Sequence, residues 1–256
     1  DGLVFKGSIN TRSIHEFAFD KYGRLFFRHN DSTSGSNPDK ISDYDNSCTL
    51  NPPAYTYNLC IDTEDNTVYY NKTGLYKRQL YWDSWGAKTT GAKSGGQNMQ
   101  KISVGKHYIV DCRRYYSGPK GDYYDLRCID KFDIKKIYKK ITIMRQGGIR
   151  ILFGDIIIDG DILYVLFKNY SPTGTTQFGD SKMQVYSLPD FTLLKTVTGF
   201  YNAKQFLGKR DEKLYIADSV ENVPGVPKRL GIYDTITGKL KFIDVKEFSN
   251  EIEFKW

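Results

Sequence analysis

The sequence contains few of the residues from which most catalytic and metal sites are built. It has 3 histidines and 4 cysteines among 256 residues. The histidines do not follow the close spacing of a zinc-binding helix, and no Gly-x-Ser-x-Gly turn or phosphate-binding P-loop occurs. We therefore assign no catalytic residue, no metal ligand and no cofactor from the sequence.

Long hydrophobic runs are also absent. The longest, at 162–167, contains 6 residues, whereas a transmembrane helix needs about 20 apolar residues in succession. No stretch shows a sustained helical period of apolar residues either. These absences argue against a membrane-spanning helix and against a helical fold.

Aromatic residues, by contrast, are abundant, with 20 tyrosines and 15 phenylalanines. Such side chains fit the half-buried face of a pleated sheet. Short alternating segments separated by turn residues occur along most of the chain. The composition and the pattern together predict an all-β protein, with residues 1–256 forming a single domain.

Two kinds of segment recur. In the first, a turn containing Asp, Gly or Lys leads into a Leu- and Tyr-rich strand, at 20–27, 105–110, 159–165 and 211–217. In the second, two strands flank a polar turn, at 60–69, 128–134, 184–194 and 231–242. Leu163 and Leu214 lie 51 positions apart, and Tyr186 and Tyr233 lie 47 apart. A repeat of about 50 residues with two hairpins has the size of one four-stranded propeller blade.

In this respect the chain resembles β-propeller repeat proteins in general, most clearly from about residue 100 onward. The resemblance implies a propeller of four to five blades, closed by a strand at 3–9 or 248–256. The N-terminal third fits the repeat less well. A β-sandwich with long loops would give many of the same local signals and is the alternative fold.

The four cysteines are arranged as two pairs, each flanking a short loop. We expect disulfides between Cys48 and Cys60 and between Cys112 and Cys128, although the sequence permits three connectivities. Such bridges would place the protein in an oxidising compartment, as a secreted, extracellular or periplasmic protein. Four reduced thiols in a cytosolic protein are the alternative.

Positive charge is concentrated in the middle of the chain. Residues 72–150 contain 18 basic and 6 acidic residues, whereas the segments on either side are close to neutral or acidic. A basic surface attracts anionic partners in a salt-dependent manner. We expect a glycan or an extracellular protein as the partner, and no nucleic acid, because no nucleic-acid-binding module is recognisable.

Within this basic region, one segment combines lysines with apolar residues. Its lysines are Lys135, Lys136, Lys139 and Lys140. Read as a helix, the segment has Ile134, Ile137 and Ile141 on one face; read as a strand, its alternation is imperfect. It is a candidate basic patch, and the alternative is a solvated outer strand whose lysines discourage edge pairing.

Aromatic residues provide two further candidate binding sites. The first is Tyr81, Trp82 and Trp85, before a Gly-, Lys- and Ser-rich stretch at 86–100 that should form a long loop. The second is a loop bracketed by the Cys112–Cys128 bridge and containing Arg113, Arg114, Tyr115, Tyr116, Tyr123 and Tyr124. The alternative for the first is packing between two blades, and for the second a loop with no partner.

These observations favour a non-catalytic, secreted or cell-surface binding domain of the adhesin, lectin or receptor-binding type. One alternative is a carbohydrate-active propeller enzyme, a glycoside hydrolase or lyase, whose acid and base would be carboxylates lining the central channel. The candidates would be Asp20, Asp62, Asp111 and Asp218. The other alternative is a structural subunit of a surface assembly.

Overall fold

The described structure consists of strands joined by turns. The computed structural model of the chain describes residues 14–19, 22–29, 40–43, 49–50, 58–71, 75–79, 98–116, 122–144, 150–170, 181–218 and 228–245. Every paired strand within these ranges runs antiparallel to its neighbours. None of these residues belongs to a helix that is long and apolar enough to span a membrane.

The strands form five sheets, which we number in chain order. Sheet 1 contains β1 (Ile14–Phe19), β2 (Leu25–His29), β3 (Lys40–Asp43) and β4 (Thr49–Leu50). Sheet 2 contains β5 (Asn58–Asp62), β6 (Thr67–Asn71) and β7 (Leu75–Gln79). Sheet 3 contains β8 (Asn98–Val104), β9 (Tyr108–Tyr116), β10 (Asp122–Asp130) and β11 (Ile137–Met144). Sheet 4 contains β12 (Arg150–Asp159), β13 (Ile162–Tyr170), β14 (Ser181–Ser187) and β15 (Thr192–Phe200). Sheet 5 contains β16 (Ala203–Arg210), β17 (Lys213–Asp218), β18 (Lys228–Asp234) and β19 (Leu240–Val245).

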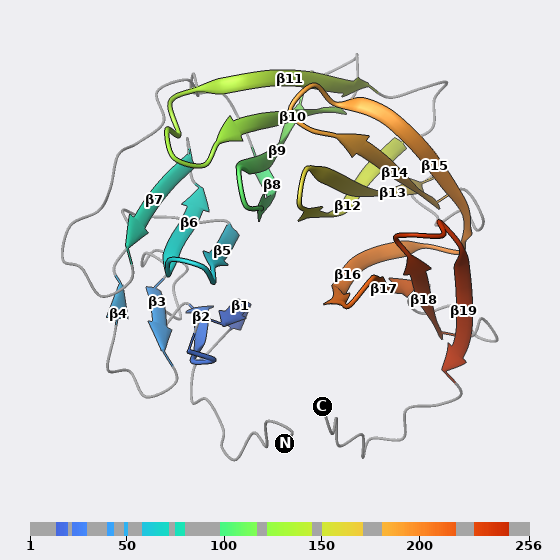
Figure 1. Cartoon of the computed structure of the whole chain (residues 1–256), viewed down its shortest axis with the longest axis horizontal. Coiled ribbons are helices and arrows are strands. Elements are labelled where there is room, and N and C mark those ends of the chain that lie inside the picture. The colour runs from blue at the N-terminus through green and yellow to red at the C-terminus, as the bar shows by residue number, and fades with distance from the viewer. Residues whose placement is uncertain are drawn as a thin grey trace.

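The sheets stand around a central axis as the blades of a β-propeller (Figure 1). The first strand of each sheet lies nearest the axis, and β1, β5, β8, β12 and β16 contact one another in that order. The last strand of each four-stranded sheet lies at the rim (Figure 1). The predicted propeller is therefore confirmed, with four four-stranded blades and a sheet of three described strands, and the β-sandwich alternative is wrong.

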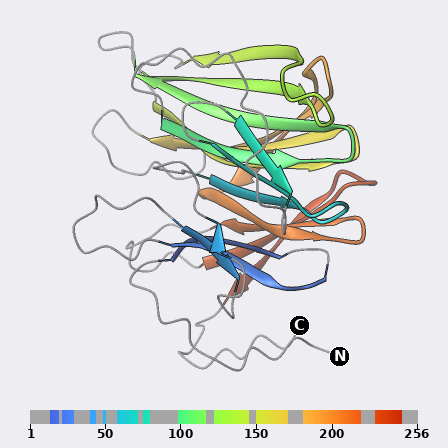
Figure 2. The ribbon, with the colours of Figure 1, turned by 90° about the vertical axis from the view of Figure 1, so that its left-hand side faces the viewer.

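The turns follow the repeated segments of the sequence. The turns at 105–107, 160–161 and 211–212 lead into strands, as predicted, and each joins the first and second strands of its sheet. Gly160 adopts a φ of +58° that favours glycine. The outer hairpins at 184–194 and 231–242 are also confirmed, whereas the hairpin predicted at 128–134 has its second strand later, at Ile137–Met144. Seen from the side, hairpin turns of several sheets point to the right (Figure 2).

One predicted equivalence is wrong. The segment 60–69 was matched to the outer hairpins, but it forms the inner hairpin of sheet 2, from β5 to β6. Its polar turn resembles the outer turns because an aspartate side chain accepts a backbone N–H two residues later in both: Glu64 N donates to Asp62 Oδ1 at 3.0 Å, and Phe132 N to Asp130 Oδ1 at 2.8 Å. Because both turns have this hydrogen bond, the sequence does not distinguish an inner hairpin from an outer one. The predicted closing strands, 3–9 and 248–256, lie outside the described residues.

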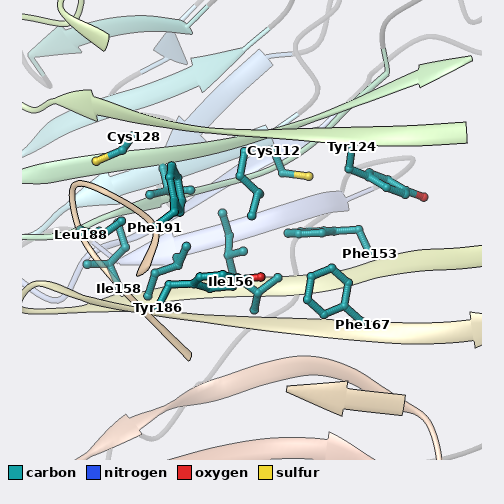
Figure 3. Packing of buried hydrophobic residues seen from close by; sticks show 14 residues of the cluster. Cys112, Tyr124, Cys128, Phe153, Ile156, Ile158, Phe167, Tyr186, Leu188 and Phe191 are labelled. Atoms are coloured by element: carbon teal, nitrogen blue, oxygen red, sulfur yellow. The ribbon is translucent and has the colours of Figure 1, made fainter. Parts of the chain in front are cut away.

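The hydrophobic core lies between successive sheets. In β9, Val110 packs toward sheet 4, whereas the preceding residue, Ile109, packs toward sheet 2. This alternation arises because successive side chains of a strand point to opposite faces. Figure 3 shows the cluster between sheets 3 and 4, where Phe153 stacks on Tyr124 and meets Phe167 edge-on. Each large apolar side chain buried in this way contributes about 1.5–3 kcal/mol.

Two cysteines belong to this same cluster, and they are not bridged. Cys112 of β9 and Cys128 of β10 are buried free thiols (Figure 3). Their strands pair so that Cys112 is opposite Leu126 and Cys128 is opposite Val110. The predicted Cys112–Cys128 disulfide is therefore wrong. Each thiol instead fills apolar space between two blades.

The other predicted bridge, between Cys48 and Cys60, is not placed, because Cys48 lies outside the described residues. The expectation of an oxidising, extracellular location loses one of the two bridges on which it depended. It stays a prediction.

Candidate functional site

The lysine-rich segment forms the outer hairpin of sheet 3. Its turn, 131–136, joins β10 to the rim strand β11, so the strand interpretation of the sequence is confirmed over the helical one. Lys135 and Lys136 lie in the turn, Lys139 and Lys140 lie on β11, and all four are exposed. We call the turn 131–136 together with β11 the basic edge.

The turn of the basic edge is held by Asp130. Asp130 Oδ1 accepts the backbone N–H groups of Phe132 (2.8 Å) and Asp133 (3.0 Å). Asp130 Oδ2 accepts the hydroxyl of Tyr138 at 2.6 Å. The hydrogen bond from Tyr138, followed by those from the two backbone amides, lowers the pKa of Asp130 to about 2. An ionised carboxylate thus fixes the shape of the turn.

Tyr138 connects this turn to the neighbouring hairpin. Its ring meets that of Tyr108 edge-on, with the centroids 5.6 Å apart. The ammonium of Lys136 lies 4.4 Å from the centroid of the Tyr138 ring and 3.7 Å from Asp130 Oδ2. Tyr138 is also the extra residue of a bulge, because the register of β10 with β11 shifts between Cys128 and Ile129. The bulge turns this side chain into the cluster around Asp130.

Contacts with sheet 2 restrain the turn from the other side. Lys131 is 3% exposed and forms ion pairs with Asp62, which is 6% exposed, and with Glu64 at 3.1 Å. Burial lowers the pKa of Lys131, but its hydrogen bonds to the two carboxylates outweigh that effect, and the pKa is raised. Lys77 Nζ donates to the carbonyl oxygen of Phe132 at 3.1 Å. The turn is therefore fixed to the adjacent blade.

Phe132 projects from this restrained turn into solvent, with 72% of its surface exposed. The corresponding turn of sheet 5 offers a comparison, because Asp234 Oδ1 accepts the N–H of Ile236 at 3.1 Å and Ile236 is 76% exposed. Exposure alone thus does not distinguish Phe132. What distinguishes it is its hairpin, which also carries the exposed Tyr138 and four exposed lysines, whereas the hairpin of Ile236 carries two lysines that the structure describes as exposed.

The four lysines differ in whether their ammonium groups form ion pairs. Lys136 lies close to Asp130, and Lys140 Nζ is 3.3 Å from Asp125 Oδ2. The side chains of Lys135 and Lys139 form no hydrogen bond or ion pair with any residue that the structure describes. These two cations are available to a partner.

Lys139 can be compared with the lysines at the same register position of two other rim strands. Lys195 of β15 donates to the carbonyl oxygen of Gly238 in the next sheet at 2.9 Å. Lys241 of β19 is exposed and, within the described ranges, has no side-chain partner. Lys241 is thus a matched control for Lys139, and Ile236 is one for Phe132.

The predicted loop between Cys112 and Cys128 is largely strand. Arg113 and Tyr124 are 1% and 2% exposed, so the structure buries these two side chains where an exposed loop was expected, and their role in binding stays a prediction. Arg114 and Tyr123 are half-buried in β9 and β10. Tyr115 and Tyr116 belong to β9, but their side chains are outside the description, as are the residues of the first aromatic site, Tyr81, Trp82 and Trp85.

Arg113 belongs to a buried charge cluster on the face of sheet 3 opposite the cysteines. Arg127 Nε donates to Asp111 Oδ1 at 2.8 Å, and Arg127 Nη2 pairs with the other carboxylate oxygen. Arg113 Nε lies 3.5 Å from that second oxygen. The sequence does not predict this cluster, because the alternation of side chains along a strand shows which residues share a face but not whether that face is buried.

Three of the four carboxylates considered as acid and base form ion pairs in the structure. Asp62 pairs with Lys131, and Asp111 pairs with Arg127. Asp218 is fully buried and accepts the guanidinium of Arg229, with Nη2 at 2.6 Å from Oδ2. These three side chains therefore connect strands or blades. Asp20 lies outside the described residues, and no group of three His, Cys, Asp or Glu side chains suited to a metal ion occurs among those described.

The residues that the sequence analysis missed are Phe132 and Lys131. A phenylalanine between charged residues in a polar turn is itself a signal, because turns seldom need such a side chain. The burial of Lys131 gave no signal, because it depends on carboxylates about 67 positions away.

Comparisons with known proteins concern the fold alone. No protein-family model and no curated protein matches the sequence. A chain in the crystal structure of the mitotic checkpoint complex is similar with a TM-score of 0.59 and 9% identity, over 95% of this chain and 73% of that one. Acylaminoacyl peptidase from Pyrococcus horikoshii gives 0.54 and 12%, over 86% of this chain and 37% of that one. Acylaminoacyl peptidase in complex with a chloromethyl ketone gives 0.56 and 11%, over 89% and 38%.

Proposed function

We propose that the protein is a non-catalytic binding domain that contacts an anionic partner protein through the basic edge. The observation that carries the proposal is the exposed Phe132 on a restrained turn. On the same hairpin, the side chains of Lys135 and Lys139 form no ion pair with any described residue. Interface hot spots often contain an aromatic anchor that fills a pocket of the partner, and cations beside the anchor attract an anionic surface.

The rigidity of the turn supports this proposal. A partner that binds Phe132 does not have to order a loop, because Asp130 and the contacts with sheet 2 already hold it. Each side chain that need not be immobilised saves about 0.5–1.5 kcal/mol on binding. A protein partner is favoured over an anionic glycan because the apolar surface of Phe132, Ile137 and Tyr138 needs an apolar counterpart.

Binding to poly-L-glutamate, measured by calorimetry at about 20 mM and about 150 mM ionic strength, tests the electrostatic part. We expect binding that weakens with salt and that falls at least several-fold in the Lys135→Glu/Lys139→Glu variant. Lys241→Glu, which makes half that change in net charge on another rim strand, should have much less than half the effect. The proposal would be contradicted if no binding occurred at low salt. It would also be contradicted if Lys241→Glu lost half as much affinity as the Lys135→Glu/Lys139→Glu variant.

The apolar part is tested with the natural partner, captured by affinity purification from the source cells and then purified. Phe132→Ser should weaken that complex by at least tenfold, whereas Ile236→Ser, which removes a comparably exposed side chain, should leave it unchanged. Equal effects of the two substitutions would mean that Phe132 is not the anchor.

A further inference from the structure

Among the residues that the structure describes, the rim strand β11 has one paired neighbour, β10 (Figure 1). The outer edge of such a strand presents backbone N–H and C=O groups to which a further strand can bind. From Lys139 to Met144 the pairing with β10 is continuous, without a register shift. Six residues of regular edge are enough to receive a short extended peptide.

The last strands of the other four-stranded sheets suit this role less well. β4 has only 2 described residues. The pairing of β14 with β15 contains two register shifts, and such irregularities twist an edge away from a partner. β19 has a regular six-residue edge, but its exposed charges are the opposed pair Lys241 and Asp244. Among the last strands of the four-stranded sheets, β11 alone combines a regular edge with a surplus of positive charge.

The two faces of β11 also differ. Ile141 and Ile143 are half-buried and pack against the apolar cluster between sheets 3 and 4, so part of their surface is left uncovered. On the opposite face, Thr142 Oγ1 donates to Asp125 Oδ1 at 2.6 Å and Lys140 lies near the same carboxylate. Lys139 lies at the start of the regular edge, beside the turn that carries Lys135.

From this arrangement we infer that the partner contributes an acidic, extended segment that pairs with the edge of β11 as a fifth strand of sheet 3. This inference rests on the proposed function and specifies how the partner binds. Side chains of the segment that point toward sheet 4 are apolar and cover Ile141 and Ile143. Carboxylates at the end near the turn neutralise Lys139 and Lys135.

The lysines then have a selective role. Charged residues on an exposed edge prevent pairing with neutral or basic strands, because an ammonium would be desolvated without a counter-charge. A strand that supplies carboxylates is not subject to this penalty. The same residues thus discourage aggregation and admit one class of partner.

The test uses two synthetic peptides of identical side chains, with Val and Thr alternating in the centre and Glu at both ends. One has an ordinary backbone, and the other is N-methylated at its central residues and so has no N–H groups to donate there. We expect the ordinary peptide to bind at least tenfold more tightly. It should also slow hydrogen exchange in 139–144 but not in 240–245, the matched edge of β19.

The outcomes separate the two proposals. If both peptides bind equally, or if protection appears in β19 instead of β11, strand addition is wrong, while the proposed function still stands on its own tests. If the ordinary peptide does not bind, strand addition is also wrong. If poly-L-glutamate also fails to bind at low salt, the proposed function fails as well.

Discussion

Replacing Lys131 by methionine tests whether the basic edge is fixed to sheet 2 by a buried ion pair. Methionine retains most of the side-chain volume but removes the ammonium that neutralises Asp62. Because Asp62 is only 6% exposed, its carboxylate would lose its counter-charge in a place where water cannot replace it. Removing one partner from such a buried pair costs about 3–5 kcal/mol.

The lower end of that range is expected here, because Asp62 still accepts the N–H of Glu64 at 3.0 Å. The second pair of Lys131, with Glu64, adds about 1 kcal/mol or less, since Glu64 is 62% exposed. A loss of about 3 kcal/mol is large against a typical stability of about 5–15 kcal/mol. Urea unfolding followed by circular dichroism measures it.

The double variant Lys131→Met/Asp62→Leu is the control. It removes both charges together, so no unpaired charge stays buried, and it should recover most of the stability that the single variant loses. Native-state hydrogen exchange should show faster opening of 131–136 in the single variant only. A single variant within about 1 kcal/mol of the native protein, or a double variant that is less stable than the single one, would refute the reasoning.

Three further predictions concern other parts of the molecule. Asp218→Ala should lower the free energy of unfolding by about 3–5 kcal/mol, measured by urea denaturation, because it leaves the N–H groups of Tyr201 and Asn202 without an acceptor and the Arg229 guanidinium without its counter-charge. The pKa of Asp130 is lowered to about 2, so the stabilisation it provides should be complete above about pH 4 and lost as the pH falls toward 2. Tyr138→Phe should raise that pKa toward 3.8, as NMR titration of the carboxylate would show. Burial raises the pKa of the Cys112 thiol and raises that of Cys128 to about 12, so both should react with a thiol reagent only after unfolding.

The fold was predictable because its signals are local. Each hairpin depends on a turn of a few residues and on alternation in the strands beside it, and these recur at nearly constant spacing. Gly160, for example, marks its turn whatever lies around it. The hairpin at 60–69 was assigned to the wrong position in its sheet for the same reason, because the turn formed by Asp62 is local and carries no information on the order of strands.

The candidate site was predictable only in part. The lysines of the basic edge were found, because a run of charge is visible in the sequence. The burial of Arg113 was not, because it depends on how sheets 2 and 3 meet. The proposed bridge between Cys112 and Cys128 failed because spacing along the chain suggested a closed loop, whereas the pairing of β9 with β10 places the two thiols opposite other residues.

The serial contacts of the innermost strands have a consequence for protein engineering. Within the described part of the chain, sheet 4 separates sheet 3 from sheet 5, so β11 and β17 lie on opposite sides of it. Substitutions in sheet 3 and in sheet 5 should therefore change stability independently, and their effects should add to within about 0.5 kcal/mol. The rim of sheet 3 can be redesigned for a new ligand while sheet 5 is strengthened separately to offset any loss.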